Sequence, residues 1–115
     1  MSDWRQQYED AAEDQAKHYS RFSDQQLIDA VRQGKTGDYY VIWYELAKRK
    51  PTATICRELY AVLLSDRPYL DRYHCAAALL TLLSCKDFEA VALSANWPEL
   101  RDNLAKLGTL IESRF

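Results

Sequence analysis

The stretch Cys75-Ala-Ala-Ala-Leu-Leu-Thr-Leu-Leu83 is the most apolar run of the chain. At nine residues it is too short to cross a bilayer, which needs about 20 residues. Alanine and leucine are strong helix formers. The run continues a segment that opens at Asp66, where Pro68 can occupy the first helical turn without losing a hydrogen bond. We therefore predict a helix over about 66–84 at the centre of the fold.

Helical patterns continue on both sides of this segment. On the N-terminal side, apolar residues recur at helical spacing over 53–65. On the C-terminal side we expect a short helix over about 87–94 and a last helix that Asn96 caps, with Pro98 in its first turn. The buried face of the last helix is expected to hold Trp97, Leu100, Leu104, Leu107 and Ile111.

Three more helices are predicted in the first fifty residues. The clearest start is at Ser23, where Gln26 three positions later completes a capping box, and this helix should end at Gly34. Before it, 3–21 has the period of an amphipathic helix. After it, Asp38 can cap a helix that reaches about 50, since a proline follows at position 51.

Length and composition limit the fold class. The chain has 115 residues, of which 48% are hydrophobic, and only three are glycine and three proline. One domain fits this length, and an all-β chain would need more turn residues. The sequence thus predicts a single all-α domain over 1–115, built as a compact bundle or a short stack of helical hairpins with about six to seven helices.

Signals of secretion and of membrane insertion are missing from the sequence. The first residues are polar and then acidic, without the basic and apolar regions of a signal peptide. The three cysteines Cys56, Cys75 and Cys85 form an odd set, and each lies in an apolar segment. This argues against a disulfide framework. We expect a cytoplasmic protein that does not contact a membrane.

Catalytic and metal-binding spacings are also missing. His18, His74 and the cysteines show no C-x-x-C or H-E-x-x-H spacing. A Cys56–His74 pair across helices is a weaker alternative, because a buried cysteine commonly acts as a small hydrophobe. The sequence therefore predicts no metal, no cofactor and no enzymatic activity.

Acidic residues concentrate at the start of the chain. Residues 1–30 hold seven acids and three bases, whereas 31–115 hold ten acids and twelve bases. The first predicted helix has an apolar stripe that includes Trp4 and Tyr8, and Glu9, Asp10, Glu13 and Asp14 fall on the opposite face. These carboxylates either form a solvated face or a docking face for a basic partner.

Tyrosine and tryptophan are abundant, with eight and three residues. Each buried ring needs a partner for its polar atom, so we expect several to be half-exposed. Exposed tyrosines are favoured anchors at interfaces. Tyr39, Tyr40 and Tyr44 form the main candidate cluster, although these rings could also simply separate packed helices.

In size and surface chemistry the chain resembles the small α-helical immunity proteins of bacterial nuclease-toxin systems, which cover a basic toxin with acidic residues and tyrosines. The positions that carry the resemblance are Glu9, Asp10, Glu13, Asp14, Tyr39 and Tyr40. The net charge of −2 departs from the strongly acidic members. The resemblance implies a binder that blocks a partner protein, with Tyr44 added to the candidate surface. The alternatives are a regulator that binds nucleic acid or a nucleic-acid enzyme, an enzyme with a reactive cysteine, and a homodimer formed through exposed rings.

Overall fold

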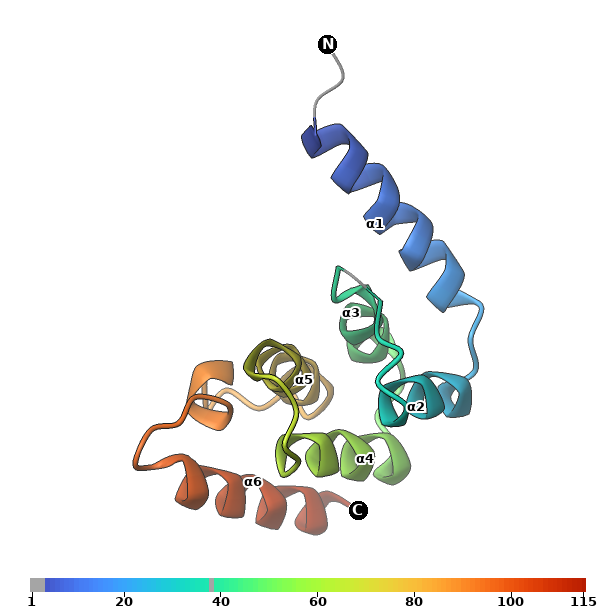
Figure 1. The fold of residues 1–115 in the computed structure, drawn as a ribbon. Coiled ribbons are helices and arrows are strands. Elements are labelled where there is room, and N and C mark those ends of the chain that lie inside the picture. Colours follow the sequence, from blue (N-terminus) through green and yellow to red (C-terminus); the bar gives the residue numbers. More distant parts are fainter. Residues whose placement is uncertain (1–3, 38) are drawn as a thin grey trace. The chain divides into compact units, whose positions relative to one another are not determined.

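The computed structural model describes residues 4–37 and 39–115, and within these ranges every regular element is helical. This confirms the predicted all-α class. The predicted cap Asp38 lies outside the described residues. The elements are α1 (Trp4–Ser20), α2 (Asp24–Arg32), α3 (Val41–Lys48), α4 (Ala53–Leu63), α5 (Tyr69–Leu82), the 3-10 turn η1 (Ala90–Leu93) and α6 (Leu100–Arg114), which Figure 1 labels apart from η1.

The helices belong to two compact units, 1–46 and 47–115. The first unit holds α1, α2 and all but the last two residues of α3, and the second holds α4, α5, η1 and α6. Each unit has its own set of buried apolar side chains. The prediction of one domain over 1–115 stays a prediction.

The start of α2 confirms the predicted capping box. The Ser23 side chain accepts a hydrogen bond from the backbone N–H of Gln26 at 3.1 Å, and the Gln26 side chain accepts one from the backbone N–H of Ser23 at 2.8 Å. Gly34, just past the helix, has a φ of 72° that favours glycine. Since Leu27 and Ile28 are buried, α2 has the predicted boundaries and the predicted apolar face.

The apolar face of α1 is buried at one end only. Tyr19 is the single buried side chain of this helix within Trp4–Ser20. A Cβ on Gly37 would lie 2.7 Å from Oε1 of Gln15 and 2.9 Å from Oη of Tyr19, so glycine lets the loop before α3 approach the C-terminal half of α1. The first turns of α1 extend past α2 and α3 (Figure 1). The predicted amphipathic helix therefore exists, but Trp4 and Tyr8 in its first half stay 77% and 46% exposed.

The helix α3 begins later than predicted, at Val41 instead of just after position 38. Tyr40 has a φ of 58°, in the left-handed region that bulky residues rarely adopt. A helix cannot pass through this conformation, and the Tyr40 carbonyl instead accepts a hydrogen bond from the N–H of Trp43 at 3.2 Å. Two of the three predicted binding tyrosines, Tyr39 and Tyr40, thus lie in the segment that leads into the helix.

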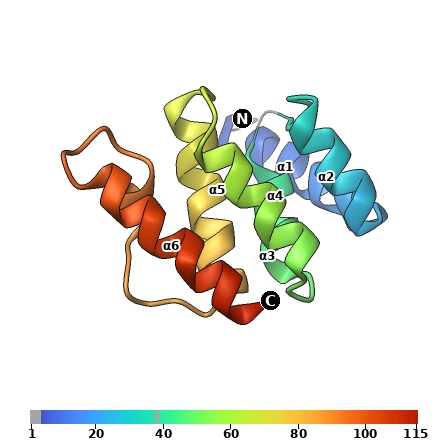
Figure 2. The ribbon, with the colours of Figure 1, turned by 90° about the horizontal axis from the view of Figure 1, so that it is seen from below.

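The second unit is built around α5, as predicted from its apolar run. The buried residues of α5 are Cys75, Ala76, Ala78, Leu79, Leu80 and Leu82. It packs against α4 and η1, while α6 packs against α4 and η1. Figure 2 shows α6 alongside these helices. This arrangement places the small side chains of α5 at the centre of the unit, where they allow close helix packing.

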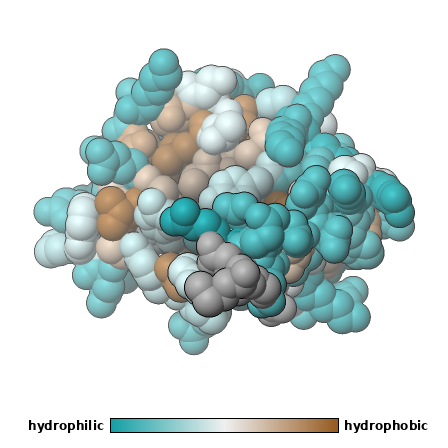
Figure 3. Space-filling model, turned by 90° about the horizontal axis from the view of Figure 1, so that it is seen from above, coloured by the Kyte–Doolittle hydropathy of each residue, from teal (hydrophilic) through white to brown (hydrophobic). Residues whose placement is uncertain are grey.

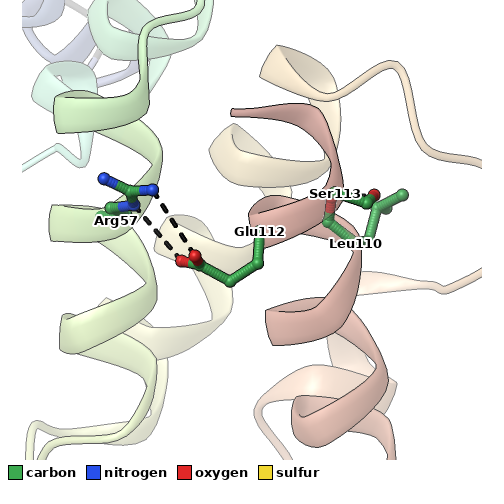
Figure 4. Close-up of polar contacts among 4 residues, drawn as sticks. All are labelled: Arg57, Leu110, Glu112 and Ser113. Atoms are coloured by element: carbon green, nitrogen blue, oxygen red, sulfur yellow. Dashed lines mark hydrogen bonds and ion pairs between the residues drawn. The ribbon is translucent and has the colours of Figure 1, made fainter.

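Close approach also joins α4 to α6. The Tyr60 hydroxyl donates a hydrogen bond to the backbone oxygen of Leu104 at 2.7 Å. A Cβ on Gly108 would lie 2.5 Å from the Tyr60 hydroxyl oxygen, so the absence of a side chain there lets the ring fit. Near the C-terminus, Arg57 and Glu112 form a bidentate ion pair, with atoms 3.3 and 3.5 Å apart (Figure 4). Both partners are exposed, so we expect this pair to contribute under about 1 kcal/mol.

Three predicted boundaries in the second unit are wrong. The expected helix over 87–94 is the short 3-10 turn η1, and Pro68 is the N-cap of α5 and not a residue of its first turn. Helix α6 starts at Leu100 after Glu99, without a cap by Asn96. A proline disfavours helical geometry in the residue that precedes it. Trp97 precedes Pro98, and it lies outside the helix with its side chain 49% exposed. No helix among the described residues is long and apolar enough to span a membrane.

Candidate protein-binding surface

All four predicted acidic residues lie on α1 with exposed side chains. Glu13 forms an ion pair with Lys17 one turn later, with the charged atoms 3.7 Å apart, and Asp10 accepts a hydrogen bond from Nε2 of Gln6 at 3.0 Å. The side chains of Glu9 and Asp14 have no ion-pair or hydrogen-bond partner within 4–37 and 39–115. Two carboxylates of this face are therefore unpaired within the described part of the chain.

The surface combines this charge with a pair of aromatic rings. Tyr8 of α1 meets Tyr39 edge to face, with ring centroids 4.6 Å apart and planes at 85°. Such pairs contribute about 0.5–1.5 kcal/mol beyond area burial. Tyr8 stays 46% exposed and Tyr39 is half-buried, so each ring keeps surface available to a partner. The contact places Tyr39 beside the acidic helix, within the first unit.

The other two predicted tyrosines lie close by in sequence. Tyr40, half-buried, takes the left-handed conformation in front of α3. Tyr44 lies one helical turn further on, within α3, and is 59% exposed. All seven predicted site residues thus belong to the first unit. The surface is best defined by α1 and Tyr39, which are joined by the Tyr8–Tyr39 ring contact.

Sequence analysis missed Trp4 as a site residue. Its helical spacing predicts a place in the apolar stripe of α1, yet its side chain is 77% exposed, the most of the large hydrophobic side chains among the described residues. In Figure 3, which looks onto the N-terminal side, hydrophilic side chains predominate and hydrophobic ones form smaller patches. The signal that could have revealed Trp4 is its place at the far end of a stripe that only the other end anchors. We name Trp4, Tyr8, Glu9, Asp10, Glu13, Asp14 and Tyr39 the acidic aromatic face.

The buried thiols lack the features of a nucleophile. Burial raises the pKa of Cys75 far above its ordinary value, and its Sγ donates a hydrogen bond to the backbone oxygen of Leu59 at 3.2 Å. Burial also raises the pKa of Cys56, and the positive charge of Arg114 only partly opposes this. A catalytic cysteine needs a stabilised thiolate, which both environments disfavour.

His74 is partly buried and lies near a carboxylate, and these two features have opposite effects on its pKa. Partial burial lowers the pKa of His74, while the nearby Asp71 carboxylate acts in the opposite direction. Its ring contacts that of Tyr73 edge to face, with centroids 5.4 Å apart. Within the described part of the chain, no group of three or more histidine, cysteine or carboxylate side chains is arranged to hold a metal ion.

Comparison with known proteins finds no family model that matches the chain, and no similar protein among curated sequences or solved structures. A functional proposal therefore rests on the surface chemistry of the chain itself. Its distinctive surface is the acidic aromatic face, because exposed carboxylates and exposed rings occur there on one helix, in which Tyr19 is the single buried side chain within Trp4–Ser20.

Proposed function

We propose that the protein is a non-enzymatic binder that blocks a partner protein with a basic surface, using its acidic aromatic face. The observation that carries the proposal is the exposure of the N-terminal half of α1. In this half Trp4 is 77% and Tyr8 46% exposed, and Glu9 has no side-chain partner within the described ranges. Aromatic anchors surrounded by charge are typical of protein interfaces.

The energetics of α1 support this use. An isolated helix of about 12–15 residues is marginal in water, and most helices in proteins depend on packing of an apolar face. In α1 the one side chain that is buried within Trp4–Ser20 is Tyr19, and near the other end Tyr8 contacts Tyr39 while staying 46% exposed. A basic partner would cover the exposed rings and neutralise the carboxylates, so binding would also stabilise the helix. Acidic residues would accelerate association and buried rings would slow dissociation.

The finer proposal concerns the class of partner. Small α-helical immunity proteins also present carboxylates and tyrosines to basic nuclease toxins, and we propose a cytoplasmic protein of bacterial origin with this role. Nuclease domains bind a polyanion and therefore carry basic surface, which is complementary to the acidic aromatic face. An adjacent gene for a large protein with a variable toxic C-terminal domain would support this assignment.

The proposal can be tested with charge reversal on α1. The chain is immobilised, partners are captured from the native host and identified by mass spectrometry, and affinity is then measured at rising salt. We expect Glu9→Lys together with Glu13→Lys to lower the affinity by at least about a hundredfold, with helix content retained by circular dichroism. The matched control is Asp87→Lys with Glu89→Lys, an equal charge reversal at exposed positions of the second unit.

Two outcomes would contradict the proposal. One is an affinity that neither salt nor the α1 reversal changes, because binding would then not use these carboxylates. The other is tight binding of nucleic acid in a gel shift at moderate salt, which would favour the regulatory alternative. If the α1 variant and the control lost affinity equally, binding would depend on the net charge of the protein and not on the acidic aromatic face.

A further inference from the structure

The second unit contains a groove that the proposed function does not use. It lies between the end of α4, the first turns of α5 and the start of α6, and has a volume of about 560 Å³. Its apolar wall includes Leu64, Trp97, Pro98 and Leu100. Leu64 is 59% exposed and Trp97 49% exposed. Volumes of this size accommodate small ligands or a few side chains of a peptide.

Two arginines stand at this groove, and no acidic residue lines it. The side chain of Arg72 donates a hydrogen bond from Nε to the backbone oxygen of Arg67 at 3.1 Å, which fixes the position of its guanidinium group. Arg101, the second residue of α6, is exposed. Within 4–37 and 39–115 neither Arg72 nor Arg101 forms an ion pair with a carboxylate. The groove thus combines an apolar wall with two uncompensated positive charges.

We propose that this groove is a second binding site, which takes a peptide segment that carries carboxylates beside an aromatic or aliphatic anchor. The anchor packs against Trp97 and Leu64, and the carboxylates accept hydrogen bonds from Arg72 and Arg101. Guanidinium groups match carboxylates geometrically and form their strongest hydrogen bonds with them. The charge of the groove is opposite to that of the acidic aromatic face, so the two surfaces select different partners.

The groove fits an acidic peptide better than a nucleic acid. Single-stranded nucleic acids need a positively charged track along the backbone in addition to stacking rings. Here two arginines flank a wall that is mainly aliphatic, in a protein with a pI near 5.6. A short peptide needs only one or two ion pairs and an apolar contact, which is what these residues offer.

The site can be probed with a panel of short synthetic peptides that are acetylated and amidated at their ends. Each member carries Trp or Leu at its centre and glutamates at varied spacing, and each has a matched version with glutamine and one with lysine. Binding to the full chain is followed by NMR, through the indole N–H of Trp97, which is assigned with a Trp97→Phe variant. We expect acidic members to bind with micromolar affinity, and their glutamine versions to bind at least about tenfold more weakly.

Charge reversal within α6 gives the matched comparison. Arg101→Glu should weaken binding of the acidic peptides by at least about tenfold, while Lys106→Glu, an equal change on the exposed surface of the same helix outside the groove, should leave it unchanged. The Glu9→Lys, Glu13→Lys variant should bind the peptides normally, so a failure of this site and a failure of the proposed function are distinguishable.

Several results would overturn the proposal. It fails if no acidic member shifts the Trp97 signal at millimolar concentration, or if the glutamine and acidic versions bind equally. It fails equally if Arg101→Glu and Lys106→Glu have the same effect. If a single-stranded oligonucleotide shifted the Trp97 signal and bound more tightly than the acidic peptides, the groove would be a nucleic-acid site instead.

Discussion

Helices α1 and α5 are of similar length but are held in opposite ways. In α1, one of 17 residues is buried, whereas in α5 six of 14 are. The burial of Leu79 is complete, while Trp4 is mostly in solvent. Burying apolar surface is the main source of folding free energy, so α5 stabilises its unit and α1 contributes little to its own. This difference indicates that the stability of the fold depends more on the burial of α5 than on that of α1.

The largest expected effect contrasts the two helices directly. Leu79→Ala leaves a cavity at the centre of the second unit and should lower the free energy of unfolding by about 2–5 kcal/mol. Trp4→Ala removes a larger side chain but should change it by less than about 0.5 kcal/mol. Urea denaturation followed by circular dichroism measures both. Similar losses for the two variants would break the comparison.

The next effect concerns the packing of α4 against α6. Gly108→Ala places a methyl group too close to the Tyr60 hydroxyl oxygen, at 2.5 Å. We expect the free energy of unfolding to fall by about 1–2 kcal/mol because of this clash, although alanine has a better helix propensity than glycine. Thr109→Ala, at the next and exposed position, is the control. A Gly108→Ala variant more stable than the wild type would show that Tyr60 moves aside at no cost.

A smaller effect is expected at the start of α2. Ser23→Ala removes the acceptor for the Gln26 backbone N–H, and loss of such a cap costs about 1 kcal/mol. Ser20→Ala, whose hydroxyl only donates to the Lys17 carbonyl, should cost less. Thermal unfolding of the two variants gives the comparison. Equal losses would mean that the capping box does not fix the beginning of α2.

The smallest predicted effect is a pH dependence located in α5. The pKa of His74 is lower in the folded chain than its ordinary value of 6.5. The unfolded chain therefore binds this proton more readily, and stability is lost as pH falls through about 6.5 and recovered above it. His74→Gln should flatten the dependence of unfolding free energy on pH between about 5 and 7. An unchanged slope in this variant would exclude His74 as its source.

The parts of the fold that local chemistry determines could be predicted from the sequence. The Ser23 capping box, the end of α2 at Gly34 and the buried run of α5 depend on neighbours within one helical turn or on composition alone. The all-α class follows from the same signals, repeated along the chain. These features need no knowledge of distant contacts.

The sequence predictions are wrong where tertiary contacts or a single backbone angle determine the structure. Trp4 and Trp97 match apolar stripes in sequence, but their side chains are 77% and 49% exposed, and periodicity cannot reveal that. Tyr40 adopts a positive φ that its residue type does not predict. The candidate acids are exposed, as expected because charged side chains are rarely buried, whereas the groove beside Arg101 depends on three elements distant in sequence.

Hydrogen exchange of the free protein tests most directly whether α1 lacks support from the fold. Amides of a helix without packing exchange through local opening, while those of a buried core helix require global unfolding. We predict that amides in the first half of α1 exchange at least about a hundredfold faster than those in the centre of α5. Protection of both helices to the same degree would show that α1 is fully held by the protein's own structure, and would contradict the account.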